Sequence, residues 1–460
     1  MKKISLLLSL LIILATIVSI TSCDKPLDPP TVNGTNLSEF TIVYDFDSLD
    51  YNKRAAEYIQ ETISKRYKLN LKVVDDDTPV NKHEIVVGET SRAISASLEA
   101  ATEGLEFAIL AQNGSVALEG DLFVIAAAAY FFMEAYASSD GGEVSIPEQV
   151  SIHTPIVKEA KNFIMLIGDG MGVYQTKMFE YLENDCEYSD GEDIFYGYML
   201  PYHGFSKTDS LLGTTDSAAG GTALACGWKT LNGYVGMNIR QESVKSLTEL
   251  ASENGKATAV MSTEVQTGAT PSSFLAHMPS RSYTDALDKA IGKTKSQYGT
   301  IVECGFDLYG VQEMASIEDR VTNVLEKLSK NKKGFFLMYE EAYIDKHSHN
   351  NDMDKTFDAL IRFNQVIARF MEFAFYNPET IIIITADHET GKLMPDENGN
   401  LAYNSGGHSS ADVPIFVYGC GTEIFNNVTI ENIQIAHTIA ALMGVDNFGD
   451  QSKVQSLTKK

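Results

Sequence analysis

Seven carboxylates and imidazoles stand at the ends of short apolar runs in this chain. The run NFIMLI gives way to GDGMG, TIIIIT gives way to ADHETG, and SGGHSSADV precedes PIFVYG. Carboxylate and imidazole together form the ligand set of zinc and similar transition metals. Carboxylates gathered in one place would repel one another without cations. The pattern therefore indicates a metal centre built from Asp169, Glu340, Asp345, His349, Asp387, His388 and His408.

Asp345 and His349 have a spacing that suits one turn of helix. They are four residues apart, so a helical turn would place both side chains on one face. His347 lies two residues after Asp345 and would point elsewhere, which predicts a surface histidine. We expect Asp345 and His349 to lie on the same side of the helix, within the cluster, and His347 to stand outside it.

The stretch TTDSAAGGTALACGWKT, beginning at Thr214, places Asp216 and Ser217 before a run of small residues. One interpretation is structural, because Asp and Ser are good helix N-caps and small residues allow close packing. The other is chemical, because anions are favoured at a helix N-terminus and a nearby metal can make a serine nucleophilic. The stretch alone leaves both interpretations open, and the metal-ligand pattern elsewhere favours the second.

The elements that carry these residues show the sequence pattern of a buried parallel sheet. Apolar runs of five or six residues alternate with helices, which is typical of parallel strands covered on both faces. In such α/β sheets, sites form beyond the carboxyl ends of the strands. One of the helices, DKTFDALIRFNQVIARFMEFAF, is expected to bury one face made of Phe357, Leu360, Ile361, Ile367 and Phe370. We predict an α/β fold with a large, mostly parallel sheet flanked by helices.

Residues 38–155 are predicted to form a separate small α/β accessory domain ahead of a catalytic domain at 156–460. FTIVYD and EIVVGET read as strands, and Ala55, Ile59 and Ile63 lie at helical spacing. LEFAILAQNGSVALEG reads as a hairpin turning at Asn113–Gly114. DLFVIAAAAYFFMEAYA reads as a closing helix.

The first residues are typical of an exported protein. Two lysines precede an apolar run, which predicts a signal peptide at 1–22. The Thr-Ser-Cys that follows is similar to a bacterial lipobox, so we expect Cys23 to be acylated and residues 23–37 to form a tether. The chain is thus predicted to be an exported bacterial lipoprotein, anchored to a membrane and facing the periplasm or cell surface.

Composition excludes one class of partner and leaves other questions open. The 460 residues carry a net charge of −26, which argues against a nucleic-acid-binding face. The negative charge is consistent either with an acidic, solvated surface or with a protein that binds cations. Absence of a CxxC spacing argues against a cysteine zinc site. Three disulfide pairings are possible among Cys186, Cys226, Cys304 and Cys420, and we expect Cys226 to be a buried small hydrophobe.

The region from Asn162 to His408 resembles the alkaline phosphatase family. The motifs IMLIGDGMG, TTDSAAGGTAL, STEVQTGATPSSFLAHMPSR, YEEAYIDKHSH, TADHETG and GGHSS match that family in order. The resemblance implies hydrolysis of phosphate monoesters through a phosphoserine, with two zinc ions and one magnesium ion. Inorganic phosphate would be product and inhibitor, and a homodimer is possible.

The resemblance also implies a role for each matching residue. Ser217 would be the nucleophile. Asp345, His349 and His408 would bind one zinc ion, and Asp169, Asp387 and His388 would bind the second. Asp169, Thr270 and Glu340 would bind magnesium. Arg281 would bind phosphate directly and Lys346 would bind it through water.

One position departs from the family. Members usually carry Asp or His two residues before the threonine of the Ala-Thr-Pro motif, and this chain has Gly268 at that position. We therefore expect the magnesium site to lack an outer partner and to hold magnesium loosely.

Two alternatives belong to other functional classes. A sister enzyme of the same superfamily could be a sulfatase or a phosphodiesterase. A sulfatase needs a C/S-x-P-x-R motif, which Ser217-Ala218-Ala219 lacks, and diesterases typically use threonine and lack the arginine. A non-catalytic, metal-binding surface lipoprotein would need the site to be a relic, and the intact nucleophile and ligand set argue against that.

Overall fold

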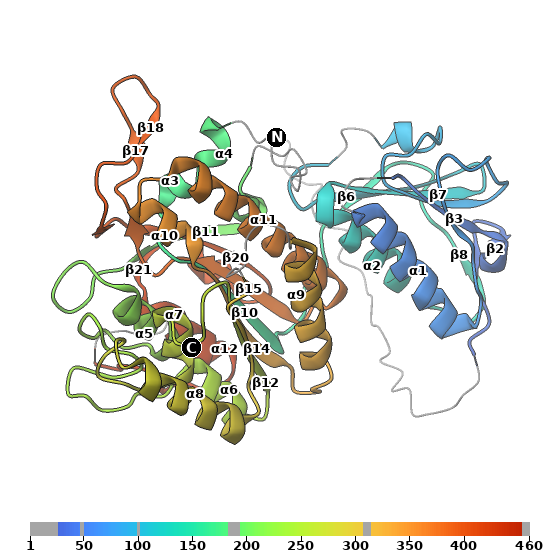
Figure 1. Ribbon diagram of the computed structural model, residues 1–460. Coiled ribbons are helices and arrows are strands. Elements are labelled where there is room, and N and C mark those ends of the chain that lie inside the picture. The colour runs from blue at the N-terminus through green and yellow to red at the C-terminus, as the bar shows by residue number, and fades with distance from the viewer. Residues whose placement is uncertain (1–25, 47–49, 99–101, 183–193, 307–313, 453–460) are drawn as a thin grey trace, which may run out of the picture.

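The computed structural model describes residues 26–46, 50–98, 102–182, 194–306 and 314–452. These residues form two units, each built around its own β-sheet (Figure 1). The expected signal peptide at 1–22, the lipidation candidate Cys23 and the cysteine Cys186 lie outside the described residues. Within the described part, no helix has the length and apolar composition needed to cross a bilayer.

The N-terminal unit contains a six-stranded sheet with the expected hairpin. Strands β6 and β7 pair antiparallel, and the turn residues Asn113 and Gly114 have φ values of 53° and 80°. Positive φ at both positions is what a tight two-residue hairpin turn needs. In spatial order the strands are β4 Val73–Asp75, β3 Thr41–Tyr44, β5 Glu84–Val87, β7 Ser115–Gly120, β6 Phe107–Gln112 and β9 Ser151–His153.

Two helices, α1 (Tyr51–Tyr67) and α2 (Ile125–Ala135), lie side by side against this sheet (Figure 1). Ala55, Ile59 and Ile63 of α1 are fully buried, as their spacing predicts. A small three-stranded sheet is added by β1 Thr31–Val32, β2 Thr35–Asn36 and β8 Glu143–Val144.

The larger sheet has eight strands and confirms the predicted fold class. Five of its seven neighbouring pairs are parallel and two are antiparallel. In spatial order the strands are β13 Ile301–Cys304, β12 Ala257–Ser262, β14 Phe335–Glu341, β10 Asn162–Gly168, β15 Thr380–Thr385, β20 Val413–Tyr418, β11 Tyr202–Lys207 and β21 Thr429–Glu431.

Helices cover both faces of this sheet, as the continuous apolar runs predict. Along β10, Phe163 and Met165 enter one core, and Ile164 and Leu166 enter the other. The first core is shared with α5 Ser217–Cys226, α6 Leu247–Glu253, α7 Ala269–Leu275, α8 Thr284–Tyr298 and α12 Ile433–Leu442. The second is shared with α4 Met178–Tyr181, α9 Met314–Leu328 and α11 Met353–Tyr376.

Short elements complete both units. They are the helices α3 Val173–Thr176 and α10 Tyr343–His349, and the paired strands β16 Glu389–Thr390 with β19 His408–Ser409 and β17 Met394–Pro395 with β18 Leu401–Ala402. Short 3₁₀ helices cover Leu37–Glu39, Ser95–Ser97, Leu122–Val124, Tyr196–Met199 and Glu423–Phe425.

Strand β20 runs against its neighbours. It pairs antiparallel with both β15 and β11, whereas the apolar pattern of PIFVYG suggests only a buried strand. Reversal of this strand has a consequence for the site, because its beginning then lies at the edge where the parallel strands end. His408, which stands just before β20, is thereby brought to the same edge as Asp169 and Asp387.

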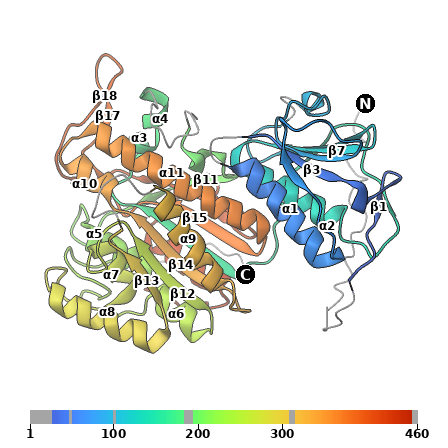
Figure 2. The same ribbon diagram turned by 45° about the vertical axis from the view of Figure 1, so that its right-hand side comes forward.

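Helix α11 lies between the large sheet and the N-terminal unit (Figures 1 and 2). Tyr376 stacks on Tyr58 with ring centroids 4.1 Å apart. Glu372 pairs with Arg54 at 2.9 Å. This helix is consequently buried on nearly all sides, which differs from the one buried face that its sequence predicts. The division that we predict between residues 155 and 156 falls between β9 and β10.

Three cysteines fall in the described part of the chain. Cys226, Cys304 and Cys420 are free thiols, so no disulfide joins any of them to another. Cys226 is fully buried in α5, as expected, and burial raises the pKa of its thiol.

Candidate active site

Three carboxylates meet at one edge of the large sheet. Asp169 follows β10, Glu340 lies near the end of β14, and Asp387 follows β15. Ile167 of β10 is level with Glu340 on one side and with Thr385 on the other. Parallel register of the three strands therefore brings these side chains together, as the sequence predicts.

One group of ligand atoms comes from Asp169, Asp387 and His388. His388 Nε2 lies 3.6 Å from Asp169 Oδ1 and 3.4 Å from Asp387 Oδ2. All three residues are buried, and their ligand atoms lie within 4.8 Å of one another. Zinc ligands about 2.0–2.2 Å from a tetrahedral metal are roughly 3.3–3.6 Å apart, so the spacing fits a zinc ion.

A second group comes from Asp345, His349 and His408. The distances are 3.3 Å from Asp345 Oδ1 to His349 Nε2, 3.6 Å from Asp345 Oδ1 to His408 Nε2, and 3.0 Å between the two Nε2 atoms. This triangle also has about the size of one face of a zinc tetrahedron. His347 packs against the ring of Tyr343 and belongs to neither group.

The two groups are adjacent. The rings of His388 and His408 stack with centroids 3.6 Å apart. His388, Asp345 and His408 also form a set of atoms close enough to hold an ion. His388 thus lies between the two candidate metal positions.

Backbone carbonyls fix which nitrogen of two histidines can bind a metal. His349 Nδ1 lies 2.8 Å from the oxygen of Gly406, and His408 Nδ1 lies 2.9 Å from the oxygen of Thr215. A carbonyl can only accept, so each Nδ1 donates its hydrogen, and Nε2 is the nitrogen of each ring that is left to bind a metal in the cluster. Such outer hydrogen bonds are typical of metal-ligating histidines.

Four buried polar atoms of the cluster have no hydrogen-bond partner among the described residues. A partnerless buried polar atom costs free energy in an ordinary interior. Every one of the four belongs to a residue that the family resemblance assigns to metal binding: Asp169 Oδ1, Asp387 Oδ2, Thr270 Oγ1 and Glu340 Oε1. Thr270 Oγ1 and Glu340 Oε1 fit the hard oxygen ligands that magnesium prefers.

Strand alternation separates the adjacent glutamates of β14. Glu340 accepts a hydrogen bond from Ser262 Oγ on β12, on the side of the cluster. Glu341 faces Arg362 of α11, whose Nη2 lies 3.4 Å from its Oε1. Sequence reasoning selects Glu340, and the structure agrees in bringing only this one of the pair to the cluster.

The carboxylates repel one another strongly. Burial, and then the charges of Asp387 and Asp345, raise the pKa of Asp169 well above its usual value. Burial and the charge of Glu264 raise the pKa of Glu340 in the same way. Burial raises the pKa of Asp387 to about 7, with Asp345 adding to the effect. Bound cations would remove this repulsion, which is the chemistry that the donor set suits.

The histidines differ in charge. Burial and the neighbouring His408 lower the pKa of His388 to about 3, so its imidazole is neutral and can donate a lone pair. A hydrogen bond with Asp345 raises the pKa of His349 to about 9. Burial opposes ionisation of Asp345, but hydrogen bonds from His349 and Thr390 outweigh it and lower the pKa of Asp345.

Ser217 is the first residue of α5, and Asp216 is its N-cap. Asp216 Oδ1 accepts a hydrogen bond from the backbone N–H of Ala219 at 3.0 Å. Ser217 is buried, and its Oγ lies 3.3 Å from His388 Nε2. The capping interpretation of this stretch is confirmed, and the cap fixes the helix start that places the Ser217 hydroxyl beside the cluster. The chemical interpretation stays a prediction.

Asp216 also contacts Arg281, which the sequence did not reveal. Arg281 Nη1 lies 3.4 Å from Asp216 Oδ2, and the arginine side chain is 39% exposed. The same Asp216 oxygen accepts a hydrogen bond from the backbone of Gly233 at 3.0 Å. Arg281 is thus held beside the start of α5 with part of its guanidinium accessible.

Lys346 has a partner that sequence reasoning missed. Its Nζ lies 3.0 Å from Glu264 Oε2 and 4.4 Å from the centre of the Tyr343 ring. Glu264 fills the space beside Gly268, where we expected an outer partner to be missing. Thr390 is a second omission, since its hydroxyl donates to Asp345 Oδ1 at 2.5 Å and lies 3.3 Å from His388 Nδ1.

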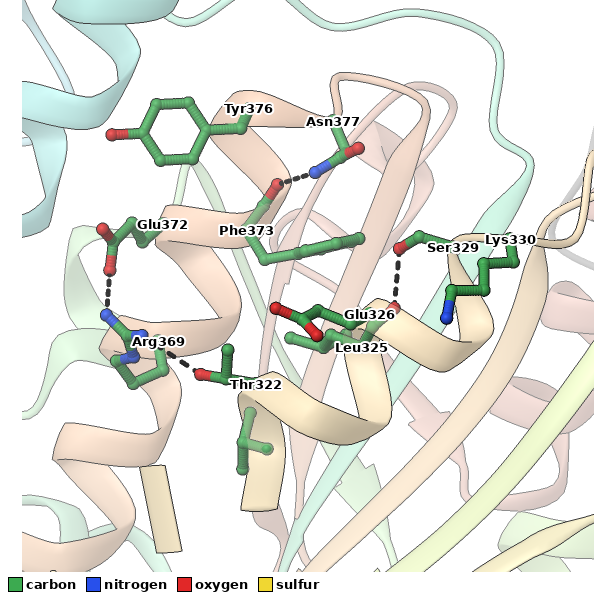
Figure 3. Close-up of a pocket in the computed structure, with 11 residues that line it drawn as sticks. Thr322, Leu325, Glu326, Ser329, Lys330, Arg369, Glu372, Phe373, Tyr376 and Asn377 are labelled. Carbon is green, nitrogen blue, oxygen red and sulfur yellow. Dashed lines mark hydrogen bonds and ion pairs between the residues drawn. The ribbon is translucent and has the colours of Figure 1, made fainter. Parts of the chain in front are cut away.

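A cavity elsewhere is not this site. It has a volume of about 490 Å³ and lies between α9 and α11, lined by residues such as Leu325 and Phe373. Figure 3 shows Arg369 bridging Glu372 and Thr322 at its rim. None of the predicted ligands lines it. We therefore place the candidate active site where the predicted ligands converge, and not at this cavity.

Comparisons with known proteins point in one direction. The profile of the family described as alkaline phosphatase matches residues 160–309 and 302–396, together more than half of the chain. Alkaline phosphatase 4 of Bacillus subtilis is 27% identical over 322 residues, covering 58% of this chain and 69% of that protein. Alkaline phosphatase 3 of the same bacterium is 30% identical over 285 residues, covering 51% and 62%.

Solved structures share the fold. Alkaline phosphatase from the Antarctic bacterium TAB5 aligns with a TM-score of 0.54 at 24% identity, covering 63% of this chain and 100% of that one. The enzyme from Thermus thermophilus aligns with a TM-score of 0.54 at 17% identity, covering 66% and 95%. A variant of the TAB5 enzyme was solved with magnesium bound.

Proposed function

The chain belongs to the alkaline phosphatase family, and from this premise we propose that it hydrolyses phosphate monoesters through a phosphoserine on Ser217. A site for two zinc ions and one magnesium ion would surround that serine. The observation that carries the proposal is the 3.3 Å distance from Ser217 Oγ to His388 Nε2, because His388 belongs to one group of ligand atoms and lies against His408 of the other.

The metal assignments follow the two groups and the partnerless oxygens. Asp345, His349 and His408 would hold one zinc, and Asp169, Asp387 and His388 the other. Magnesium would bind beside them at Asp169, Thr270 and Glu340. When bound, the metals offset the charge of a phosphate dianion and lower the pKa of the serine hydroxyl.

Ser217 carries the covalent step. The Ser217 hydroxyl gives up its proton and its Oγ attacks phosphorus. A P–O bond to serine forms, the P–O bond to the leaving group breaks, and the departing alkoxide takes up a proton to leave as the alcohol. Backbone N–H groups at the start of α5 would face a phosphate bound to Ser217. A water oxygen then attacks the phosphoserine, which restores the serine hydroxyl and releases inorganic phosphate.

Substrate class is tested by three matched chromogenic esters. We expect hydrolysis of p-nitrophenyl phosphate well above that of bis-p-nitrophenyl phosphate and p-nitrophenyl sulfate. Faster cleavage of the diester or of the sulfate would support the corresponding sister enzyme. Cleavage of none of the three by metal-loaded protein would support the non-catalytic surface lipoprotein.

Arg281 is expected to grip the phosphate through its planar fork. A charge-assisted hydrogen bond contributes about 1.5–3 kcal/mol. Arg281→Ala should therefore lower kcat/KM by roughly 10- to 200-fold, and inorganic phosphate should inhibit more weakly. Both quantities are measured by steady-state kinetics with phosphate as the inhibitor.

The matched control for this variant is Arg240→Ala, an exposed arginine outside the cluster. Phosphate inhibition should stay unchanged in the control. Equal inhibition of Arg281→Ala and wild type would remove Arg281 from the phosphate site and reopen the diesterase alternative.

We also propose that the chain is exported and tethered. Support comes from the lysines and apolar run of residues 1–22, with Cys23 at their end as the acylation site. Mass spectrometry of the mature N-terminus tests this, since a lipid-modified Cys23 is expected as the first residue.

A further inference from the structure

Gly268 leaves a space that another residue fills. A Cβ added at position 268 would lie 1.8 Å from Glu264 Oε1 and 2.1 Å from Glu264 Cδ. The φ of Gly268 is −55°, a value that any residue adopts, so its backbone does not require glycine. The missing side chain is instead what lets the Glu264 carboxylate occupy this place.

Glu264 reaches that place from the end of β12, four residues earlier in the chain. Its backbone N–H donates to Ser262 Oγ at 3.0 Å, and the same Ser262 hydroxyl donates to Glu340 Oε2. Oε2 of Glu264 pairs with Lys346 at 3.0 Å. The Glu264 side chain is 15% exposed, so its charge is largely shielded from solvent.

The surroundings point to a cation beside this carboxylate. Gly268 is the N-cap of α7, which carries Thr270 in its first turn. Thr270 Oγ1 and Glu340 Oε1 are fully buried and lack hydrogen-bond partners among the described residues. Glu264 adds a third negative group to a place that already holds Glu340 and Asp169, and Lys346 offsets only one of these charges. An interior without a further cation would disfavour the negative charge that remains.

We propose that Glu264 supplies the outer carboxylate of the magnesium site, in place of the side chain absent at position 268. This inference rests on the proposed function, because it presumes magnesium at Asp169, Thr270 and Glu340. It replaces the expectation of a loosely held ion. Gly268 and Glu264 then act as a pair, in which the glycine makes room and the glutamate provides the charge. Glu264 is a positioning residue that acts on the ion from outside its first ring of ligands.

The test measures magnesium binding directly. Full-length protein is loaded with zinc, stripped of magnesium and titrated with magnesium chloride by calorimetry, and metal content is checked by elemental analysis. Residues outside the first ring of ligands typically change metal affinity by about 10–100-fold. Glu264→Gln should therefore raise the magnesium Kd by that factor while zinc content stays at the wild-type value.

Three further variants separate the possible causes. Gln266 lies in the same loop, but its side chain bonds to Asp288. The magnesium affinity of Gln266→Ala should therefore match that of wild type. Lys346→Met removes a positive charge and should leave magnesium binding equal or tighter. The double variant Glu264→Ala/Gly268→Asp moves the carboxylate to position 268 and should recover most of the lost affinity.

Several results would overturn the inference. Wild-type magnesium affinity in Glu264→Gln, with zinc retained, contradicts it while leaving the proposed function intact. A loss in Lys346→Met equal to that in Glu264→Gln shows that Glu264 serves only to hold the lysine. Failure of the double variant to recover affinity, with zinc content and melting temperature unchanged, also counts against it. Wild-type protein that binds neither metal contradicts both this inference and the proposed function.

Discussion

Ser217→Ala is expected to lower kcat/KM for a phosphate monoester by roughly a thousandfold or more, because the covalent route disappears. The ligand cluster stays intact, so slow direct attack by water can persist. Acid quenching with labelled phosphate measures the covalent species, and the variant should trap none. Wild-type protein should carry label at Ser217.

The matched control is Ser273→Ala. Ser273 packs on α5 through a hydrogen bond from its Oγ to the oxygen of Ala218 at 3.3 Å, but it stands outside the ligand cluster. This control should lose some stability and keep its phosphoenzyme. Label found on another residue of Ser217→Ala would remove Ser217 as the nucleophile.

Metal removal is the second large effect. Exhaustive chelation should abolish activity, and added zinc should restore it, since the ligand atoms of Asp169, Asp387 and His388 can stabilise charge only when a cation joins them. Activity and zinc content are followed together through dialysis. Chelator already saturated with zinc is the control and should leave activity unchanged. Full activity in protein that elemental analysis finds free of metal contradicts the assignment.

Loss of metal should also make stability depend on pH. The folded pKa of Asp387 is raised to about 7 without a cation, whereas an unfolded Asp titrates near about 4. Between these values the folded state binds more protons than the unfolded state, so its stability falls as pH rises. Chelation should thus lower the melting temperature more at pH 8 than at pH 5. An equal loss at both pH values would contradict the repulsion argument.

Much of the sheet could be predicted because its signal is local. The apolar run around Ile164 and the polar cluster that follows it predict a buried strand ending at a site, and both are observed. The direction of β20 could not be predicted, because a run of apolar residues looks the same whether the strand lies parallel or antiparallel to its neighbours. The burial of α11 on nearly all sides depends on contacts with Tyr58 and Arg54, which no local pattern of α11 contains.

The site divides in the same way. Spacing pairs Asp345 with His349, and the structure brings both into one triangle with His408. The contact of Asp216 with Arg281 joins residues 65 positions apart, so it depends on the fold and not on a motif. Sequence analysis does not identify Glu264, because its place beside position 268 depends on how its loop folds back.

The place of β20 in the sheet also sets the order in which the molecule can assemble. Within the described part, β11 pairs only with β20 and β21, and β20 separates it from β15. Because the chain is synthesised from its N-terminus, the residues of β11 exist long before those of either partner strand. Until residues 413–431 have been synthesised, one edge of the sheet stays open and exposed to wrong pairing. His408 is synthesised just before β20. A chain truncated before β20 would keep every proposed ligand, including His408, but would lack the strand that holds His408 at the edge of the sheet. We therefore expect binding of the full set of ions to await synthesis of β20.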